Sequence, residues 1–165
     1  MEMNISSIRK EYKLHSLNEK DVNLNPITQL KLWLDEAVKS ELTEPTAMAL
    51  ATSTPTGRPS IRIVLLKEIE DKGLVFFTNY GSYKARQIES NPFAAVVFFW
   101  PELERQVRIE GYVEKVSEEI SDKYFEERPE GSKIGAWASE QSKVIDSRIQ
   151  LEIKTAEYYS NLSSI

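Results

Sequence analysis

The chain has no cysteine and a single histidine, His15, among its 165 residues. Without cysteine there can be no thiol nucleophile, cysteine-ligated zinc, iron–sulfur cluster or disulfide, and this composition suits a reducing cytoplasm. A Ser-His-Asp triad would have to use His15, and a histidine-rich metal site cannot be assembled. We therefore expect no metal site, and we expect a cytoplasmic protein.

Long apolar runs and strong charge are lacking as well. No stretch is long enough to span a membrane, and the first residues lack the basic-then-apolar pattern of a signal peptide. The net charge of −5 argues against broad affinity for nucleic acid but leaves room for a local cationic pocket. We expect neither a membrane nor a nucleic-acid partner. With 41% apolar residues, the chain is long enough to bury the core of one domain.

The pattern of apolar and turn residues predicts a polar N-terminal arm over 1–24 and a single domain over 25–165. Asn25 and Pro26 begin a predicted amphipathic helix over 26–40. Strands are predicted over 46–53 and from about 60 onward, and 62–67 and 73–78 are expected to pair as a hairpin. A helix should begin after Ser82 and end at Asn91.

The sequence pattern in the second half of the domain predicts two more strands, followed by helical segments. The continuous apolar run at 93–100 indicates a strand buried on both faces, in a barrel wall or beneath a partner subunit. Residues 105–116 alternate as a half-exposed strand. Helices are expected over 117–127 and 142–159, and a short helix or a set of turns over 131–139. The pattern favours a mainly β fold, a small antiparallel barrel with peripheral helices.

Three cations near the predicted hairpin are candidates for anion binding. Ser82 is a plausible N-cap, which places Lys84 in the first turn, where a cation opposes the helix dipole unless an anion is bound beside it. The simpler interpretation is a solvated surface lysine. Alternation along the strand points Arg62 and Lys67 to opposite faces, and each could equally mark a strand end at the rim of the sheet.

Seven motifs in order connect these residues to a known family. They are RIVLLK (62–67), FTNYGSYK (77–84), NP (91–92), LERQV (103–107), YF with RP (124–125 and 128–129), SKIGAW (132–137) and QS (141–142). Together they closely resemble the pyridoxamine 5′-phosphate oxidase family, over nearly the whole chain from Arg9 onward.

The resemblance implies an FMN-binding split β-barrel that works as a homodimer, with each flavin in a cleft between subunits. Arg62 and Lys84 would hold the FMN phosphate, and Phe77 and Thr78 would meet the flavin ring. The cofactor-binding set implied by the resemblance is Arg62, Ile63, Val64, Leu65, Leu66, Lys67, Phe77, Thr78, Lys84, Gln106, Gln141 and Ser142.

The implied reaction is the oxidation of pyridoxamine or pyridoxine 5′-phosphate to pyridoxal 5′-phosphate, with oxygen as the acceptor. The cofactor carries the hydride chemistry, and the protein supplies positioning and charge. No catalytic side chain is identified. The substrate-binding set implied by the resemblance is Arg9, Tyr12, Lys67, Tyr124, Arg128 and Ser132, with the first two coming from the N-terminal arm.

The chain departs from the family pattern in two places. Tyr83 stands where members usually carry a basic residue, so one phosphate contact is lost or supplied by another residue. Members also continue past the position of Ile165 through a strand with a tryptophan and an Arg-Leu-His motif. The resemblance therefore implies a C-terminally incomplete domain with impaired turnover.

Two other functions remain open on the sequence. One is a split-barrel FMN protein with a different substrate or none, which would be yellow but would not be bleached by pyridoxamine phosphate. The other is a noncatalytic domain that binds anionic partners, which would be colourless.

Overall fold

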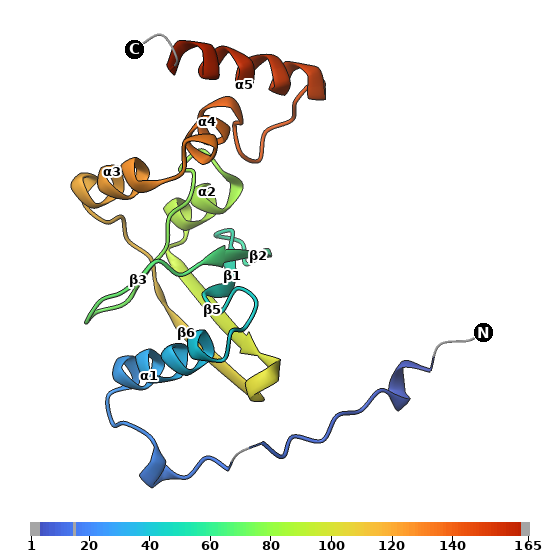
Figure 1. The fold of residues 1–165 in the computed structure, drawn as a ribbon, viewed down its shortest axis with the longest axis vertical. Helices are drawn as coiled ribbons and strands as arrows, with labels where there is room; N and C mark the ends of the chain where they lie inside the picture. The colour runs from blue at the N-terminus through green and yellow to red at the C-terminus, as the bar shows by residue number, and fades with distance from the viewer. Residues whose placement is uncertain (1–3, 15, 163–165) are drawn as a thin grey trace.

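The computed structural model describes residues 4–14 and 16–162, so the expectation for His15 lies outside the described residues. Its centre is an antiparallel sheet in the order β2-β1-β5-β6, formed by Pro59–Leu65, Ala47–Ser53, Phe93–Trp100 and Arg105–Tyr112. A two-stranded ribbon, β3 (Glu68–Ile69) with β4 (Leu74–Val75), lies beside it. Figure 1 shows the helices arranged around this sheet.

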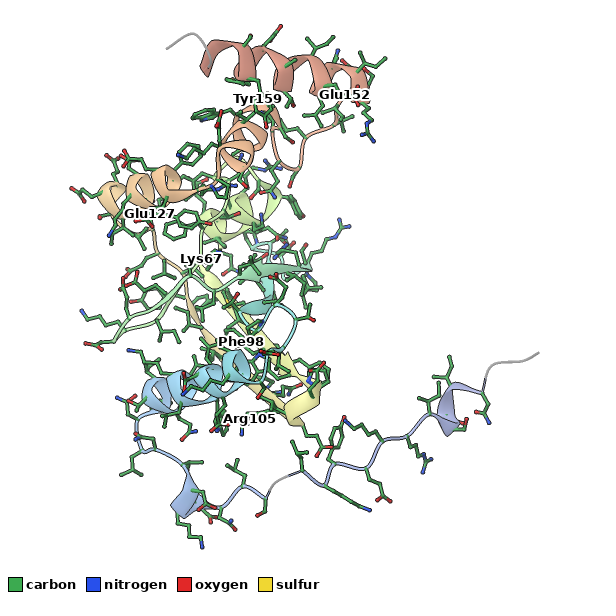
Figure 2. All side chains as sticks on the ribbon, viewed as in Figure 1. Lys67, Phe98, Arg105, Glu127, Glu152 and Tyr159 are labelled. Carbon is green, nitrogen blue, oxygen red and sulfur yellow. The ribbon has the colours of Figure 1, made fainter. Side chains whose placement is uncertain are left out.

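Helix α1 (Pro26–Lys39) covers one end of the sheet. Asn25 Oδ1 accepts hydrogen bonds from the backbone N–H groups of Ile27 and Thr28, and proline follows the cap, as the sequence predicts. The buried face of α1 packs on the sheet around Phe98, which is fully buried. Arg105 of β6 fixes the helix further, because it pairs with Glu36 at 2.5 Å and lies over the ring of Trp33; Figure 2 labels Phe98 and Arg105 near this helix.

The remaining helices gather at the opposite end of the molecule (Figure 1). They are α2 (Tyr83–Ser90), α3 (Glu118–Glu127), α4 (Glu130–Ala138) and α5 (Arg148–Leu162). Ser82 caps α2 and Ser117 caps α3 with their side-chain oxygens. The sequence predicted both starts, and also the stop of α2 at Asn91.

The sheet has one buried and one exposed face. Cross-strand partners share a face, and Leu50 pairs with both Arg62 and Val96, so Arg62 belongs to the side that carries the core. The other side exposes large apolar residues. Ile61 is 70% exposed, Ile63 66%, Phe93 69% and Phe99 58%.

Several expectations are corrected by this arrangement. Of the residues 62–67, only Lys67 bonds to the predicted partner 73–78, through its N–H to Val75 O, and β2 pairs with β1 instead. The hairpin is the short β3–β4 ribbon, closed by Glu70 N–H donating to Gly73 O. Strand β5 is buried on one face only, and β6 ends at Tyr112 rather than 116. The sheet of the described residues is open, with β2 and β6 as edges, whereas the expected mainly β fold, an antiparallel sheet with peripheral helices, is confirmed.

The two ends of the chain differ in how they follow the predictions. The expected helix over 142–159 begins only at Arg148, after turns that include Ser142 with a φ of +66°. The described part of the arm is extended apart from the single turns Ile5–Ser7 and Glu19–Asp21. It is tied to the body where Leu14 N–H donates to Glu104 Oε2 at 2.8 Å. In the described part of the chain, no helix is both long and apolar enough for a transmembrane span.

Candidate functional site

Arg62 lies in the middle of β2, on the buried side of the sheet, and its guanidinium is held by three oxygen atoms. Its Nη1 donates to the backbone oxygen of Leu50 at 3.0 Å and to Thr52 Oγ1 at 2.7 Å. Its Nη2 donates to Gln87 Oε1 at 3.5 Å. All three acceptors are uncharged, so the arginine is fixed in place without losing its positive charge to a carboxylate.

Lys84 lies in the first turn of α2, and only 8% of it is exposed. Its ammonium group donates to Thr78 Oγ1 at 2.8 Å, Ser82 Oγ at 3.3 Å and Gln141 Oε1 at 2.9 Å. These acceptors come from the loop before α2, its cap and the turn after α4. The alternative of a solvated surface lysine is therefore wrong, and Lys84 joins the segment 78–84 to the turn after α4.

The two cations influence each other directly. Burial lowers the pKa of Lys84, and the nearby positive charge of Arg62 lowers it further. Burial also lowers the pKa of Arg62. Neither residue forms an ion pair with a carboxylate of the described residues. A buried lysine in the first turn of a helix and a half-buried arginine near it are unfavourable unless an anion is bound with them, so the pair is suited to a phosphate group.

The low pKa of Lys84 leads to a prediction about pH. Between its lowered pKa and the usual 10.5, the unfolded chain keeps a proton that the folded chain has released, so the stability of the ligand-free protein rises with pH in this window. A bound anion favours the charged lysine, so anion affinity should fall over the same window. Urea unfolding from about pH 8 to about pH 10, compared with the Lys84→Met variant, measures the first effect. A difference between the two proteins that stays constant with pH would contradict it.

The ring of Phe77, which is expected at the cofactor, lies against the ring of Tyr124, which is expected at the substrate. Their rings stack in parallel, with centroids 3.7 Å apart and planes 4° apart. Phe77 precedes Thr78, which binds Lys84, and Tyr124 belongs to α3. The stack therefore links α3 to the loop that leads to the cation pair.

Other expected substrate residues lie around α3 and α4. Arg128 ends α3, with its Cζ 5.7 Å from the centroid of the Phe125 ring. Ser132 lies in the first turn of α4 and is exposed. Lys67 follows β2 with an exposed side chain, while its backbone N–H donates to Val75 O; Figure 2 labels Lys67 near the middle of the molecule.

The backbone of the expected flavin-lining stretch is partly available. Ile63, Val64 and Leu65 belong to β2, which pairs only with β1, so alternate residues direct their N–H and C=O groups to the open edge. The N–H of Leu66 is already used, because it donates to Thr46 O. Ser142 follows Gln141 in an exposed turn.

Three expected residues are not brought to this site within one chain. Gln106 pairs with Phe99 and lies on the opposite, exposed face of the sheet from Arg62. Arg9 and Tyr12 lie in the extended arm, which leaves the body near Glu104 at the end covered by α1 (Figure 1). Their roles stay predictions.

The sequence did not identify Thr52 and Gln87, the two side chains that hold Arg62. Both are buried, each 3% exposed. Thr52 had a detectable signal, because it is a polar residue at an inward position of an apolar strand. Gln87 had none, since a glutamine on a short helix is usually solvated.

Comparison with known proteins gives a consistent result. The family model described as pyridoxamine 5′-phosphate oxidase matches residues 34–161. A relative from Nostoc punctiforme, named pyridoxine/pyridoxamine 5′-phosphate oxidase, is 54% identical over 97% of this chain and 75% of its own length. A relative of the same name from Neisseria meningitidis serogroup C is 53% identical over 93% of this chain and 73% of its own length.

Two solved structures share the fold. PhzG from Burkholderia lata 383, in complex with tetrahydrophenazine-1-carboxylic acid, superposes with a TM-score of 0.84 and 32% identity over 89% of this chain and 74% of its own. A pyridoxamine 5′-phosphate oxidase-related, FMN-binding protein from Nostoc punctiforme has a TM-score of 0.61 and 21% identity, over 79% of this chain and 73% of its own. The resemblance seen in the motifs is thus confirmed, and the chain belongs to the pyridoxamine 5′-phosphate oxidase family of oxidoreductases.

Proposed function

We propose that the chain binds FMN through Arg62 and Lys84 and oxidises pyridoxamine or pyridoxine 5′-phosphate to pyridoxal 5′-phosphate, with oxygen as the acceptor. The proposal depends most on Arg62 of β2 and Lys84 at the start of α2, two partly buried cations with no carboxylate partner among the described residues. Family membership supports FMN as the cofactor. Bound FMN would supply the hydride acceptor, and the chain would supply phosphate binding and orientation.

The residues present fit a phosphate ester. A guanidinium has five N–H donors, and three of those of Arg62 are accounted for by Leu50, Thr52 and Gln87. The Nε–H and one Nη2–H have no partner among the described residues, and this pair of donors suits two oxygens of one phosphate. All three donors of Lys84 are engaged by neutral oxygens, so an entering phosphate would exchange with one of them. Gln141, an exposed residue of a turn, is the acceptor most easily displaced.

A second phosphate position is proposed near the end of α3. Arg128, Ser132 and Lys67 carry exposed or half-exposed polar groups, and the Phe77–Tyr124 stack connects α3 with the cofactor side. A substrate whose phosphate is held by these residues would have its pyridine ring between α3 and the cofactor. Binding of two phosphate esters by separate cations would orient both reactants.

We also propose that the functional unit is a homodimer formed through the exposed sheet face. Gln106 lies on that face and cannot reach Arg62 of its own chain, so a cofactor contact from Gln106 requires a second copy. The same applies to Arg9 and Tyr12 of the arm. A cytoplasmic location, and the lack of nucleic-acid and membrane partners, stay predictions.

The experiment that tests the proposal follows the flavin. The purified chain is mixed with FMN, and the retained flavin is measured; one FMN per chain is expected. Pyridoxamine 5′-phosphate added without oxygen should bleach the flavin absorbance, and oxygen should restore it with formation of pyridoxal 5′-phosphate. A protein that binds FMN but is not bleached would contradict the substrate, and a protein that retains no FMN would contradict the proposal as a whole.

A second candidate substrate class is favoured by one observation. The PhzG structure, 32% identical to this chain, is a complex with a carboxylic acid, tetrahydrophenazine-1-carboxylic acid. This chain would then bind FMN but oxidise an aromatic carboxylic acid. The same anaerobic assay separates the two, because only the true substrate class bleaches the flavin.

A further inference from the structure

A buried polar network lies behind Arg62. Thr52 of β1 donates its hydroxyl hydrogen to Gln87 Oε1 at 2.6 Å and accepts from Arg62 Nη1 at 2.7 Å. Gln87 of α2 donates through Nε2 to Ser60 Oγ of β2 at 3.2 Å. Thr52 and Gln87 are each 3% exposed. The network therefore connects the two strands and the helix that carry the cation pair.

The network contacts only one edge of the guanidinium. Thr52 meets Nη1 and Gln87 meets Nη2, so both lie at the end of the side chain. The edge formed by Nε–H and the second Nη2–H faces away from them and has no partner among the described residues. Because a guanidinium is planar and rigid, fixing one edge also fixes the direction of the other.

The network is also electrically neutral. A carboxylate at the position of Gln87 would hold the arginine with a stronger, charge-assisted bond, but it would compensate the positive charge. An amide and a hydroxyl orient the same group and leave its charge for an external anion. Because the network carries no charge, the repulsion between Arg62 and Lys84 is not compensated. This repulsion contributes, after burial, to the lowered pKa of Lys84.

We propose that Gln87 and Thr52 are positioning residues that direct the free edge of Arg62 toward the FMN phosphate while leaving its charge uncompensated. The inference rests on the proposed function, and it adds two residues outside the expected binding set. It makes the affinity for FMN depend on the chemical nature of two side chains that need not touch the cofactor.

The decisive variant is Gln87→Glu, which keeps the shape and adds a negative charge beside Arg62. The thermal midpoint of the ligand-free protein should stay the same or rise, because a buried cation gains a partner. FMN affinity should fall by about tenfold or more, since the arginine charge is then compensated. Affinity for riboflavin, which lacks the phosphate, should change by less than about twofold. Fluorescence titration with each flavin measures both affinities.

Thr52 provides a matched pair of variants. Thr52→Val keeps the shape and removes the hydroxyl, so FMN affinity should fall by about fivefold to tenfold, whereas Thr52→Ser should retain it. In the Arg62→Ala background, Gln87→Glu should no longer weaken FMN binding, because the group that it acts on is absent. Loss of stability together with an equal loss of affinity for both flavins would assign the network a purely structural role and overturn the inference.

The outcomes also separate this inference from the function on which it rests. If Arg62→Ala lowers FMN affinity but Gln87→Glu does not, the phosphate site stands and the positioning role fails. If Arg62→Ala itself leaves FMN affinity unchanged, the proposed cofactor site fails. Should Gln87→Glu prevent folding, Thr52→Val and Thr52→Ser decide the matter alone.

Discussion

Replacing Arg62 and Lys84 together with alanine is expected to lower FMN affinity by about 10² to 10⁴-fold. Hydrogen bonds to charged groups contribute about 1.5–3 kcal/mol each, so two cations account for about 3–6 kcal/mol of binding free energy. Lys84 is 8% exposed and Arg62 is half-buried, so their charges are screened less by salt than those of surface cations. Fluorescence titration of FMN against the double variant measures the loss.

Two controls make this result specific. Arg58 and Lys72 are exposed cations, so Arg58→Ala with Lys72→Ala removes the same charge without touching the site, and FMN affinity should be nearly unchanged. Riboflavin affinity should be similar in all of these proteins, because it lacks the phosphate. Moreover, relief of the repulsion between the two cations should keep the double variant folded. Unchanged FMN affinity in the folded double variant would remove the basis of the proposed function.

The sequence predicted the start of α2 and the position of Lys84 correctly, but not the environment of Lys84. The Ser82 cap and the placement of Lys84 in the first turn follow from local rules for helix starts, which need no tertiary information. The burial of Lys84 cannot be predicted from these local rules. It depends on Gln141, which is 57 residues away in sequence and reaches the lysine only through the packing of the later helices.

Strand pairing shows a similar limit. Residues 62–67 and 73–78 both have strand composition and a turn between them, which favours a hairpin. In the structure β2 pairs with β1 over seven residue pairs, whereas the ribbon after it has two. The pairing with β1 leaves the other edge of β2 open, so it depends on which strand packs beside β2 in the folded chain, and local turn signals do not report this.

The apolar strand β5 had two interpretations on the sequence, a barrel wall or a strand covered by a partner subunit, and in the single chain one of its faces is exposed. Phe98 and Trp100 face the core, while Phe93 and Phe99 face outward on an open sheet. Single-sequence patterns cannot distinguish a strand buried within its own chain from one buried by a second copy, because both need apolar residues on both faces. Gln106, on the same outward face, has a site role only in the second case.

Replacing Ile63 with aspartate is therefore expected to convert a dimer into monomers and to weaken FMN binding at the same time. Ile63 is 66% exposed in the single chain, so the change should leave the core intact. In an interface with twofold symmetry each substitution occurs twice, so the dimer loses two apolar contacts and must desolvate two carboxylates, raising its dissociation constant by about 10³-fold or more.

The matched control is Leu24→Asp, because Leu24 is fully exposed and lies in the arm segment before α1. Analytical ultracentrifugation should find this control dimeric, with unchanged FMN affinity, and the Ile63→Asp protein monomeric. If Gln106 of a second copy contributes to each flavin site, FMN affinity of the Ile63→Asp protein should recover at concentrations high enough to restore the dimer. A monomeric Ile63→Asp protein with full FMN affinity would place the whole cofactor site within one chain, and a parent protein that is already monomeric would assign the exposed sheet face to another role.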